Sequence, residues 1–541
     1  MNLPVRSLVV TAACLLAAAV HAQEDPPARV GRVAEVAGEV RTINPEGAWS
    51  ALLRNQPLST GDRVSTDKAG RATLQFGSTV VRVGANSDLV VTQLDDQKIR
   101  LHFDHGQLAV RVRSDDIPGE LFVETDEGAW VPHHPGEYRF DRVAHQVLAV
   151  QVGSGDLLLE APDSSLPVVA PQRAEVWRTG AQQTTHYRMV PAVKDAFGDA
   201  VLAADQADDK LAPANAAAQV PSEMTGAAEL ARFGTWSVAP DGAHLWTPAK
   251  LPKDWQPYRQ GAWSWNSPWG WTWIDDQPWG FAPFHYGRWL AVKGRWAWTP
   301  GRWGAARPVY APALVGWFGG PALTVDGASA VGWVALAPDE PMFPAYAVSA
   351  NYWNALSGAS VAPAARRTVA INGRARLVPA GAAAYANRGV PGAVTVVGAA
   401  ALLPHVPVST MPGLQGVDLR KPALDERLAK ALAIAPPAAP AGHAALSAAT
   451  PQVQVSIAAV QGGGPANGAK GLAPPSAPVA SGVPVTPAKP GGHLAGVDIA
   501  RPVPPAAVAV PVVPRPVAPT AATAPIRPIT APTPPAPVAS R

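Results

Sequence analysis

Three polar side chains stand close together in the most tryptophan-rich part of the chain. His285, Tyr286 and Arg288 lie between Trp279 and Trp289. An arginine suits a carboxylate or a phosphate because its donors form a fixed planar fork, and the aromatic rings could stack on a flat ligand. These five residues form the candidate ligand-binding site. The alternative is that the polar three only close a turn before Trp289.

The tryptophans around this site allow two interpretations. Flat aromatic faces stack on the apolar faces of sugar rings, so some could be platforms for an envelope glycan, with Asp275 and Asp276 facing its hydroxyls. The favoured interpretation is that they form the core of a small sheet that is poor in aliphatic residues. We expect a core role for Trp271, Trp273 and Trp298, whereas Trp279 and Trp289, which flank the polar residues, are the better candidates for exposed contact.

Catalytic and metal chemistry find little support in the sequence. The histidines near acids fall into two clusters: His102, Asp104 and His105, and His133, His134 and Glu137. On a strand His105 would point away from the other two members of its cluster, which makes a poor chelate. The chain has no Gly-x-Ser-x-Gly, His-Glu-x-x-His or phosphate-loop motif. We therefore expect no enzyme, no catalytic residue, no metal and no cofactor.

The first 22 residues have the three parts of a secretory signal. Arg6 supplies the positive region, Leu8 to Val20 the apolar region, and the residues ending at Ala22 a small-x-small cleavage site. A lipoprotein signal at Cys14 is the less favoured alternative, because apolar residues continue beyond it. We expect a periplasmic or secreted protein.

The rest of the chain has neither an apolar run of the roughly 18 residues that span a bilayer nor a second cysteine. Its charge is uneven. Residues 23–160 carry 14 Lys+Arg against 21 Asp+Glu (net −7), residues 233–345 carry 8 against 7, and residues 361–541 carry 15 against 4 (net +11). An acidic first part and a basic last part are thus hidden by an overall charge of +3.

Residues 30–177 predict a β-domain, because short alternating runs such as 72–76 and 79–83 are separated by turn residues. Its motifs are Gly31-x-Val33, Gly38-x-Val40, Leu58-x-x-Gly61-Asp62-x-Val64-x-Thr66, Gly70-Arg71-Ala72-x-Leu74-x-Phe76-Gly77-Ser78 and Val83-Gly84-x-Asn86-Ser87. This part resembles the FecR domain, the periplasmic part of an iron-uptake signal relay. The resemblance implies the fold more strongly than the signalling, because the membrane helix of that family is missing.

Residues 191–232 predict one helix, up to about Lys210, and a linker.

Residues 233–410 form a tryptophan-rich module with an internal repeat. Between Phe233 and Trp333 the chain carries 15 of its 19 tryptophans. Gly-x-Trp recurs with its tryptophan at positions 236, 263 and 289, and each is followed nine or ten residues later by another tryptophan, at 246, 273 and 298. A regular interval of this kind marks a repeated unit, and we expect one β-hairpin per unit.

Several longer motifs lie in this module: Trp255-x-Pro257-Tyr258-x-x-Gly261-x-Trp263, Trp269-Gly270-Trp271-Thr272-Trp273, and the run from Pro278 to Trp289. With Val331-Gly332-Trp333 and residues 387–394, they resemble an uncharacterised Trp-rich domain of exported bacterial proteins. That resemblance implies a family and no reaction.

Residues 411–541 predict a disordered tail, since Pro, Ala, Val and Gly dominate and cannot bury enough surface to offset chain entropy. Its basic residues could contact an anionic surface. One pattern occurs twice, Leu414-x-Gly416-Val417-Asp418 and Leu494-x-Gly496-Val497-Asp498. Chance duplication in a biased sequence and a docking motif both remain open.

The fold class that the sequence predicts is mainly β: a FecR-like domain, one linker helix, a module of repeated hairpins and a disordered tail. The function that we expect is a non-enzymatic cell-envelope binding or scaffold protein. Its partner would be an envelope polysaccharide or an envelope protein, and nucleic acid is not expected. The alternatives are a periplasmic sensor in FecR-type signalling and a glycan-binding or glycan-processing protein.

Export leads to a first prediction. The mature protein should appear in the periplasmic or secreted fraction with Gln23 at or near its N-terminus, because cleavage follows the small-x-small site. N-terminal sequencing of the purified protein checks this. An intact leader, or a lipid on Cys14, would contradict it.

Overall fold

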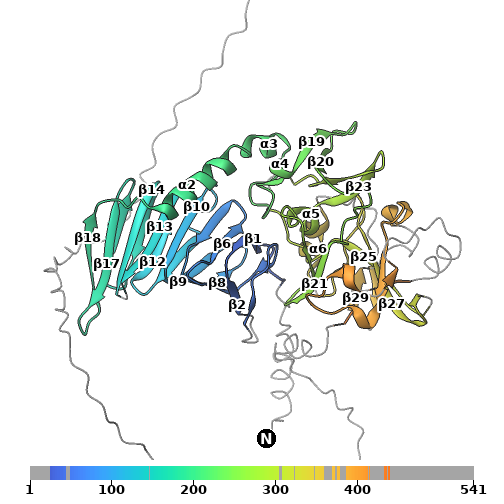
Figure 1. Cartoon of the computed structure of the whole chain (residues 1–541), viewed down its shortest axis with the longest axis horizontal. Helices are drawn as coiled ribbons and strands as arrows, with labels where there is room; N and C mark the ends of the chain where they lie inside the picture. Colours follow the sequence, from blue (N-terminus) through green and yellow to red (C-terminus); the bar gives the residue numbers. More distant parts are fainter. Residues whose placement is uncertain are drawn as a thin grey trace, which may run out of the picture.

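The computed structural model describes residues 25–43, 49–144, 146–303, 307–321, 323–346, 348–358, 368–371, 374–377, 385–411, 413–414, 432–434 and 437–438. Within them the chain is mainly β, as the sequence predicts: a two-sheet sandwich, helical segments, and a second β-rich part (Figure 1). The signal sequence and nearly all of the predicted tail lie outside the described residues. None of the helices in the described ranges is long and apolar enough to cross a membrane.

The N-terminal part, called the sandwich below, consists of two sheets, each with nine strands among the described residues. The first sheet has the order β18(Thr184–Val190), β17(Arg173–Thr179), β14(Val147–Ser154), β13(Gly136–Ala144), β10(Gln107–Val112), β7(Thr79–Val83), β6(Arg71–Phe76), β1(Gly31–Ala37), β4(Pro57–Leu58). The second has the order β16(Ser165–Val169), β15(Asp156–Glu160), β12(Gly128–Pro132), β11(Leu121–Thr125), β9(Ile99–His105), β8(Asp88–Leu94), β5(Arg63–Thr66), β2(Val40–Ile43), β3(Trp49–Ala51).

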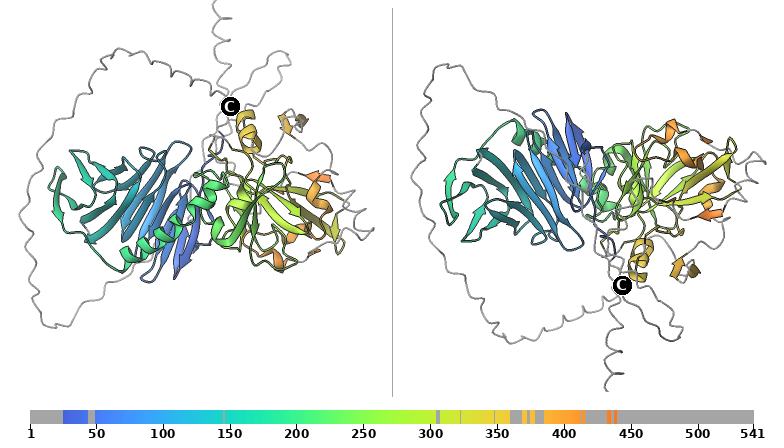
Figure 2. Two further views of the ribbon diagram at one scale, coloured as in Figure 1. Left: turned by 90° about the horizontal axis from the view of Figure 1, so that it is seen from above. Right: turned by 90° about the horizontal axis from the view of Figure 1, so that it is seen from below.

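The two sheets pack face to face over one core (Figure 2). Phe140 of the first sheet contacts Phe103 and Trp130 of the second, with ring centroids 6.5 and 6.0 Å apart. Alternation along each strand turns every second side chain inward, so that in β9 Leu101 and Phe103 are buried while Arg100 and His102 are only half-buried. The residues that resemble a FecR domain run from β1 to just after β7.

Helix α2 (Ala196–Asp209) follows the sandwich and lies along its first sheet (Figure 1). It begins at Asp195, whose side chain accepts a hydrogen bond from the Gly198 amide at 2.9 Å, as N-cap residues do. Arg139 of β13 binds Asp195, and Arg82 of β7 binds Asp205 at 2.7 Å. Ion pairs thus attach this helix to the sheet.

Sequence predicts one helix in this region, and the structure adds two short ones. Helix α3 (Ala212–Ala217) and helix α4 (Leu230–Phe233) follow α2. Pro213, within the predicted linker, lies in the first turn of α3, where a missing backbone N–H costs nothing.

The tryptophan module begins with the predicted hairpins. They are β19(Gly234–Val238) with β20(His244–Pro248), β21(Gly261–Asn266) with β22(Gly270–Asp275), and β23(Arg288–Val292) with β24(Arg295–Thr299). In each hairpin the two repeated tryptophans are register partners: Trp236 with Trp246, Trp263 with Trp273, and Trp289 with Trp298. The hairpin prediction is confirmed, and the interval of nine or ten residues is the length that places the two indoles opposite each other.

The glycine of each Gly-x-Trp unit has a steric reason. A Cβ atom at Gly234, Gly261 or Gly287 would come within 2.7 Å of the indole of the second repeated tryptophan. It would also lie within 2.5 Å of a backbone carbonyl oxygen of the opposite strand. Any larger residue would clash with the indole and with the opposite strand, so the repeated tryptophans pack closely only because the repeated residue is glycine.

The rest of the module adds shorter elements around this aromatic core. They are α5(Ala282–His285), β25(Val315–Gly319), β26(Thr324–Val325), β27(Ala328–Ala335), α6(Ala350–Gly358), β28(Thr368–Ile371), β29(Arg374–Leu377), η2(Ala386–Gly389), β30(Thr395–Gly398), η3(Ala399–Ala401) and η4(Val408–Thr410). One sheet of the described residues has the order β31-β30-β27-β25-β32, with β26 beside β27.

Two strands of that sheet come from the segment that was predicted to be disordered. They are β31 (Gly413–Leu414) and β32 (Leu432–Ile434), and Ile434 is the register partner of Trp317 in β25. A short aliphatic run can thus pair with a sheet edge even inside Pro/Ala-rich sequence, and the boundary at residue 411 stays a prediction. Of the tail pattern that occurs twice, at residues 414–418 and 494–498, only Leu414 is among the described residues.

Burial of the indoles leads to a prediction on stability. Trp273 is 0% exposed, so Trp273→Ala should lower the free energy of unfolding by about 3–5 kcal/mol. Trp49, which is 49% exposed, is the matched control, and Trp49→Ala should change it by no more than about 0.5 kcal/mol. Urea denaturation of the mature protein measures both, and equal effects would contradict the core assignment.

Candidate functional site

The five predicted site residues lie in the interior of the tryptophan module. Trp279, Tyr286 and Arg288 are 2–3% exposed, and His285 and Trp289 no more than 1%. The expectation that Trp279 and Trp289 are exposed contacts is wrong. Trp279 packs on Trp246 at 5.0 Å and Trp289 on Trp255 at 5.4 Å between ring centroids, so neither ring offers a face to a glycan.

Backbone carbonyls account for the burial of the polar residues. The Nδ1 atom of His285 lies 2.8 Å from the carbonyl oxygen of Ala311. Burial lowers the pKa of His285 to about 4, so the ring is neutral at pH 7. Arg288 donates to the carbonyl oxygens of Glu340 and Gly287 at 2.9 and 2.7 Å, and burial lowers its pKa to about 10. Both side chains hold the loops around them in place.

The two aspartates that were expected to face sugar hydroxyls differ in burial, because Asp275 is buried and Asp276 is exposed. Asp275 is 2% exposed and accepts hydrogen bonds from the Trp273 indole at 3.0 Å and the Gln277 amide at 2.9 Å. Burial raises the pKa of both Asp275 and Asp276. Asp275 is part of the core and does not face a ligand.

Charged residues gather instead where the sandwich meets the module, a contact called the junction below. Glu120, which precedes β11, accepts two hydrogen bonds from Arg307 of the module, both at 2.9 Å. Arg29, next to β1, donates a third at 2.6 Å. Burial alone would raise the pKa of Glu120, but these hydrogen bonds outweigh it and lower the pKa.

Several buried contacts extend the junction. Arg32 is 0% exposed and forms an ion pair with Glu229. Asn55, equally buried, donates to the carbonyl oxygens of Asp275 and Gln277 at 2.9 and 2.7 Å. Val30 belongs to the hydrophobic core of the module although it directly precedes the first strand of the sandwich. The two parts are therefore joined by packing as well as by charge.

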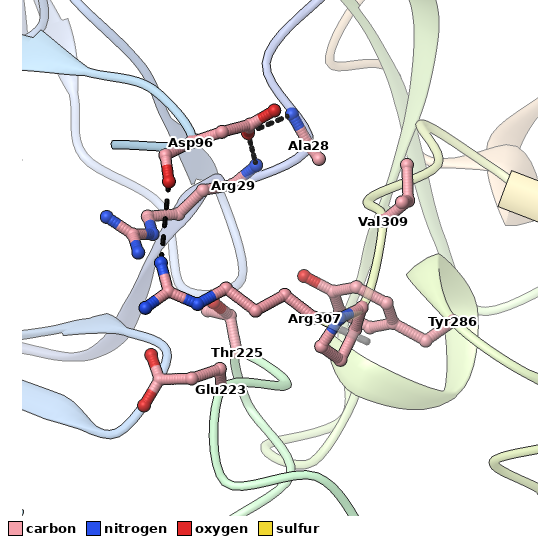
Figure 3. A pocket seen from close by; sticks show the side chains of 9 residues that line it. Ala28, Arg29, Asp96, Glu223, Thr225, Tyr286, Arg307 and Val309 are labelled. Atoms are coloured by element: carbon pink, nitrogen blue, oxygen red, sulfur yellow. Dashed lines mark hydrogen bonds between the residues drawn. The ribbon is translucent and has the colours of Figure 1, made fainter. Parts of the chain in front are cut away.

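A cavity of about 230 Å³ opens at this junction (Figure 3). Its walls come from the segment before β1, the turn between β8 and β9, the linker, and the module: Ala28, Arg29, Asp96, Glu223, Thr225, Tyr286, Arg307, Pro308 and Val309. Of the five predicted site residues, only Tyr286 is among them. The junction cavity is the candidate site that the structure supports.

Sequence reasoning missed the other residues of the cavity. Arg307 and Glu120 are 187 positions apart, and neither stands in a motif. The only usable signal was the net charge of −7 in residues 23–160, which indicates that the sandwich needs basic partners. It does not tell which arginine supplies them.

The histidine clusters make local contacts. The Nδ1 atom of His105 lies 2.8 Å from Asp104, and His134 pairs with Asp156. Across the described ranges, no three His, Cys, Asp or Glu side chains are grouped so that they could hold a metal ion.

Comparison with known proteins gives partial matches. Residues 227–340 match a family of unknown function, DUF6600, which corresponds to the part of the module that holds the repeated hairpins. Two solved structures, each named as a “putative anti-sigma factor” from Parabacteroides distasonis, are similar at 16% and 15% identity with a TM-score of 0.21. Each match covers 24% of this chain and 60% of the solved one. No curated protein matches the sequence, and the resemblance to a FecR domain stays a prediction.

The two hydrogen bonds from Arg307 to Glu120, called the Glu120 clamp below, lead to a prediction on how stability depends on pH. Arg307→Met keeps the aliphatic stem and removes the hydrogen bonds, so it should lower the free energy of unfolding by about 1 kcal/mol at pH 7, a value reduced by solvent exposure. Because the folded state lowers the pKa of Glu120, this difference should persist above the ordinary glutamate value of 4.5 and vanish as the pH falls through the lowered pKa.

Urea denaturation between pH 7 and pH 3 measures the difference. Arg41→Met is the matched control, because its ion pair with Glu39 lies at the surface, with side chains 61% and 54% exposed. A loss in Arg307→Met that stays the same at all pH values would show that packing, and not the ion pair, is responsible.

Proposed function

We propose that this protein is an exported, non-enzymatic binding or scaffold protein of the bacterial cell envelope, in which the sandwich and the tryptophan module act as one unit. The observation that carries the proposal is the junction. Arg307 of the module donates two hydrogen bonds to Glu120 of the sandwich, beside a cavity that both parts line. Export rests on the signal-like first 22 residues.

The junction favours a scaffold because it fixes one part relative to the other. Buried ion pairs hold partners in one geometry, and removing one member leaves an uncompensated charge that costs about 3–5 kcal/mol. Arg32 and Glu229 form such a pair, with side chains 0% and 10% exposed. A body held in this way presents its surfaces at fixed positions, which a binding or scaffold role requires.

A second candidate is a periplasmic sensor in FecR-type signalling, and one contact favours it. The backbone amide of Gly77, within the FecR-like motif, donates to the Thr225 hydroxyl at 2.9 Å. Thr225 in turn donates to the carbonyl oxygen of Val30 at 2.9 Å and lines the junction cavity. A ligand in the cavity would thus lie one hydrogen bond away from the motif turn.

Trp279 and Trp289, the tryptophans predicted to contact a glycan, are buried, but other tryptophans are exposed or half-buried. Trp49 is the most exposed tryptophan of the described chain, at 49%, and it lies at the edge of the sandwich. Trp265 and Trp303 are half-buried at the module surface. A polysaccharide that binds this protein would have to use side chains such as these.

Envelope binding can be tested directly. The purified mature protein should co-sediment with isolated peptidoglycan sacculi or with lipopolysaccharide vesicles, and a chain ending at residue 411 tests the contribution of the basic tail. Trp49→Ala and Trp303→Ala report on stacking. Recovery of the protein in the cytoplasmic fraction of its host would contradict the proposal.

The two candidate functions differ in their effect on gene expression. Deletion of the gene should leave transcription largely unchanged if the protein is a scaffold. Changed transcription confined to the targets of one extracytoplasmic sigma factor would favour the sensor.

A further inference from the structure

Three aspartates near the end of helix α2 oppose the helix to which they belong. Asp205, Asp208 and Asp209 stand among its last five residues, and no basic residue lies in its last turn. The carboxyl end of a helix is the negative end of its dipole, so an aspartate there is unfavourable. Asp205 also precedes the other two by three and four positions, a spacing at which like charges repel each other. The second half of α2 is therefore destabilised by its own side chains.

Apolar packing does little to offset this cost. Asp205 is the one buried side chain of α2, every residue of which the structure describes. Leu202 is 48% exposed and Val201 is half-buried. The helix has 14 residues, and helices shorter than about 12–15 residues are marginal in water on their own. The second half of α2 needs another source of stability.

Arginines of the sandwich supply that stability. Arg82 of β7 donates to Asp205 at 2.7 Å and to Asp208 at 3.3 Å. Arg113, which directly follows β10, donates to Asp205 at 3.1 Å and to Asp209 at 3.0 Å. These contacts are made at the end of α2 that is unfavourable by itself. The helix there depends on cations that belong to other elements.

Two further arginines complete the cluster. Arg232 of α4 donates to Asp208 at 2.9 Å, and Arg111 of β10 lies 3.6 Å from Asp209 while it also binds Glu137. The side chain of Asp209 is 46% exposed and that of Asp208 is 23% exposed. Ion pairs that remain in contact with water are individually weak and are screened by salt. The order of this half of α2 should therefore depend on ionic strength.

Both flanks of the segment are fixed by other contacts. Arg139 binds the N-cap residue Asp195 with two hydrogen bonds, at 2.7 and 2.6 Å, and its guanidinium lies 5.2 Å from the centre of the Phe197 ring. A bidentate arginine–carboxylate pair is stronger than a single contact. On the other side Asn215 of α3 accepts a hydrogen bond from the Trp236 indole at 3.1 Å. Loss of the aspartate contacts would thus melt the segment locally and leave it attached at both ends.

We propose that the second half of α2, residues 201–209, is a conditional helix, which is ordered while the arginines hold its aspartates and which melts when salt screens these pairs. The sandwich stays folded, because its hydrophobic core includes no residue of α2. Melting frees Arg82 and Arg113 on the side of the first sheet along which α2 lies (Figure 1). The segment between the sandwich and the module thereby responds to ionic strength.

This inference goes beyond the envelope role and does not depend on it. It concerns the segment that connects the two parts, whereas envelope binding concerns the surface that a partner contacts. A conditional helix is compatible with a scaffold and with a sensor.

Hydrogen exchange of the purified mature chain, followed by mass spectrometry, tests the proposal at about 0.01 M and about 1 M sodium chloride. The Debye length falls from about 30 Å to about 3 Å between these conditions. Amides of residues 201–209 should exchange about tenfold faster at high salt, because local opening becomes easier there. Peptides from β13 and β14 should keep their rates, since their protection comes from the sandwich core.

Arg113→Met assigns the effect to the ion pairs. It keeps an apolar stem and removes the hydrogen bonds to Asp205 and Asp209, so the second half of α2 should exchange about tenfold faster already at low salt and respond less to added salt. Arg188→Met is the matched control, because Arg188 lies on the same sheet and pairs with Glu175 away from α2. It should leave the exchange of α2 as it is in the parent.

Three results would overturn the proposal: α2 rates that are equal at both salt concentrations, an acceleration that is as large in β13 and β14 as in α2, or parent-like rates in Arg113→Met at low salt. The first two come from the unaltered chain, so they count even if the variant does not fold. None of them bears on export or on co-sedimentation with sacculi, so the conditional helix and the envelope role can fail separately.

Discussion

Indole burial in the tryptophan module decides where the polar groups of that half of the chain lie. A buried indole contributes a large apolar surface, but its N–H needs an acceptor. Trp246 donates to the carbonyl oxygen of Leu230, Trp298 to that of Tyr286 and Trp333 to that of Tyr258, at 2.8–2.9 Å. Each of these bonds fixes a backbone position outside the hairpin of its tryptophan, so the rings order the loops as well as the core.

The same packing places the junction. Because Val30 lies in the module core and the Tyr310 amide donates to the carbonyl oxygen of Ala28 at 2.9 Å, the segment before β1 is held by the module. Arg29 is therefore fixed between the two parts, and its guanidinium donates to the same Glu120 oxygen as that of Arg307. Charge alone would be a weak connection at a half-exposed site, and it is the apolar anchoring of Val30 that holds the arginines in place.

Only features that depend on residues close together in sequence could be predicted from it. The hairpins follow from the interval between repeated tryptophans, because the side-chain pattern and the turn together set strand register over so short a span. The exposure of Trp279 and Trp289 was predicted wrongly, since polar neighbours in sequence were taken as a sign of solvent. His285 Nδ1 contacts the carbonyl oxygen of residue 311 and Arg288 Nε donates to that of residue 340, which no local pattern reveals. The junction depends on such distant pairs throughout.

The two glutamates of the junction, Glu120 and Glu223, differ in pKa because the arginine hydrogen bonds go to only one of them. Both feel burial, which raises a carboxyl pKa, yet the pKa of Glu120 ends below its ordinary value and that of Glu223 above it. The difference lies in the donors, because Arg307 directs both of its terminal nitrogens at Glu120. Moving it to Glu223 would leave Glu120 with Arg29 alone.

A proton can therefore neutralise Glu223 without breaking the hydrogen bonds between Arg307 and Glu120, because burial raises the pKa of Glu223. A raised pKa means that this proton binds at a higher pH than an ordinary glutamate requires. Glu120 keeps its charge to a lower pH than Glu223 does, because its pKa is shifted the other way. The junction can thus stay closed while the charge at its cavity changes.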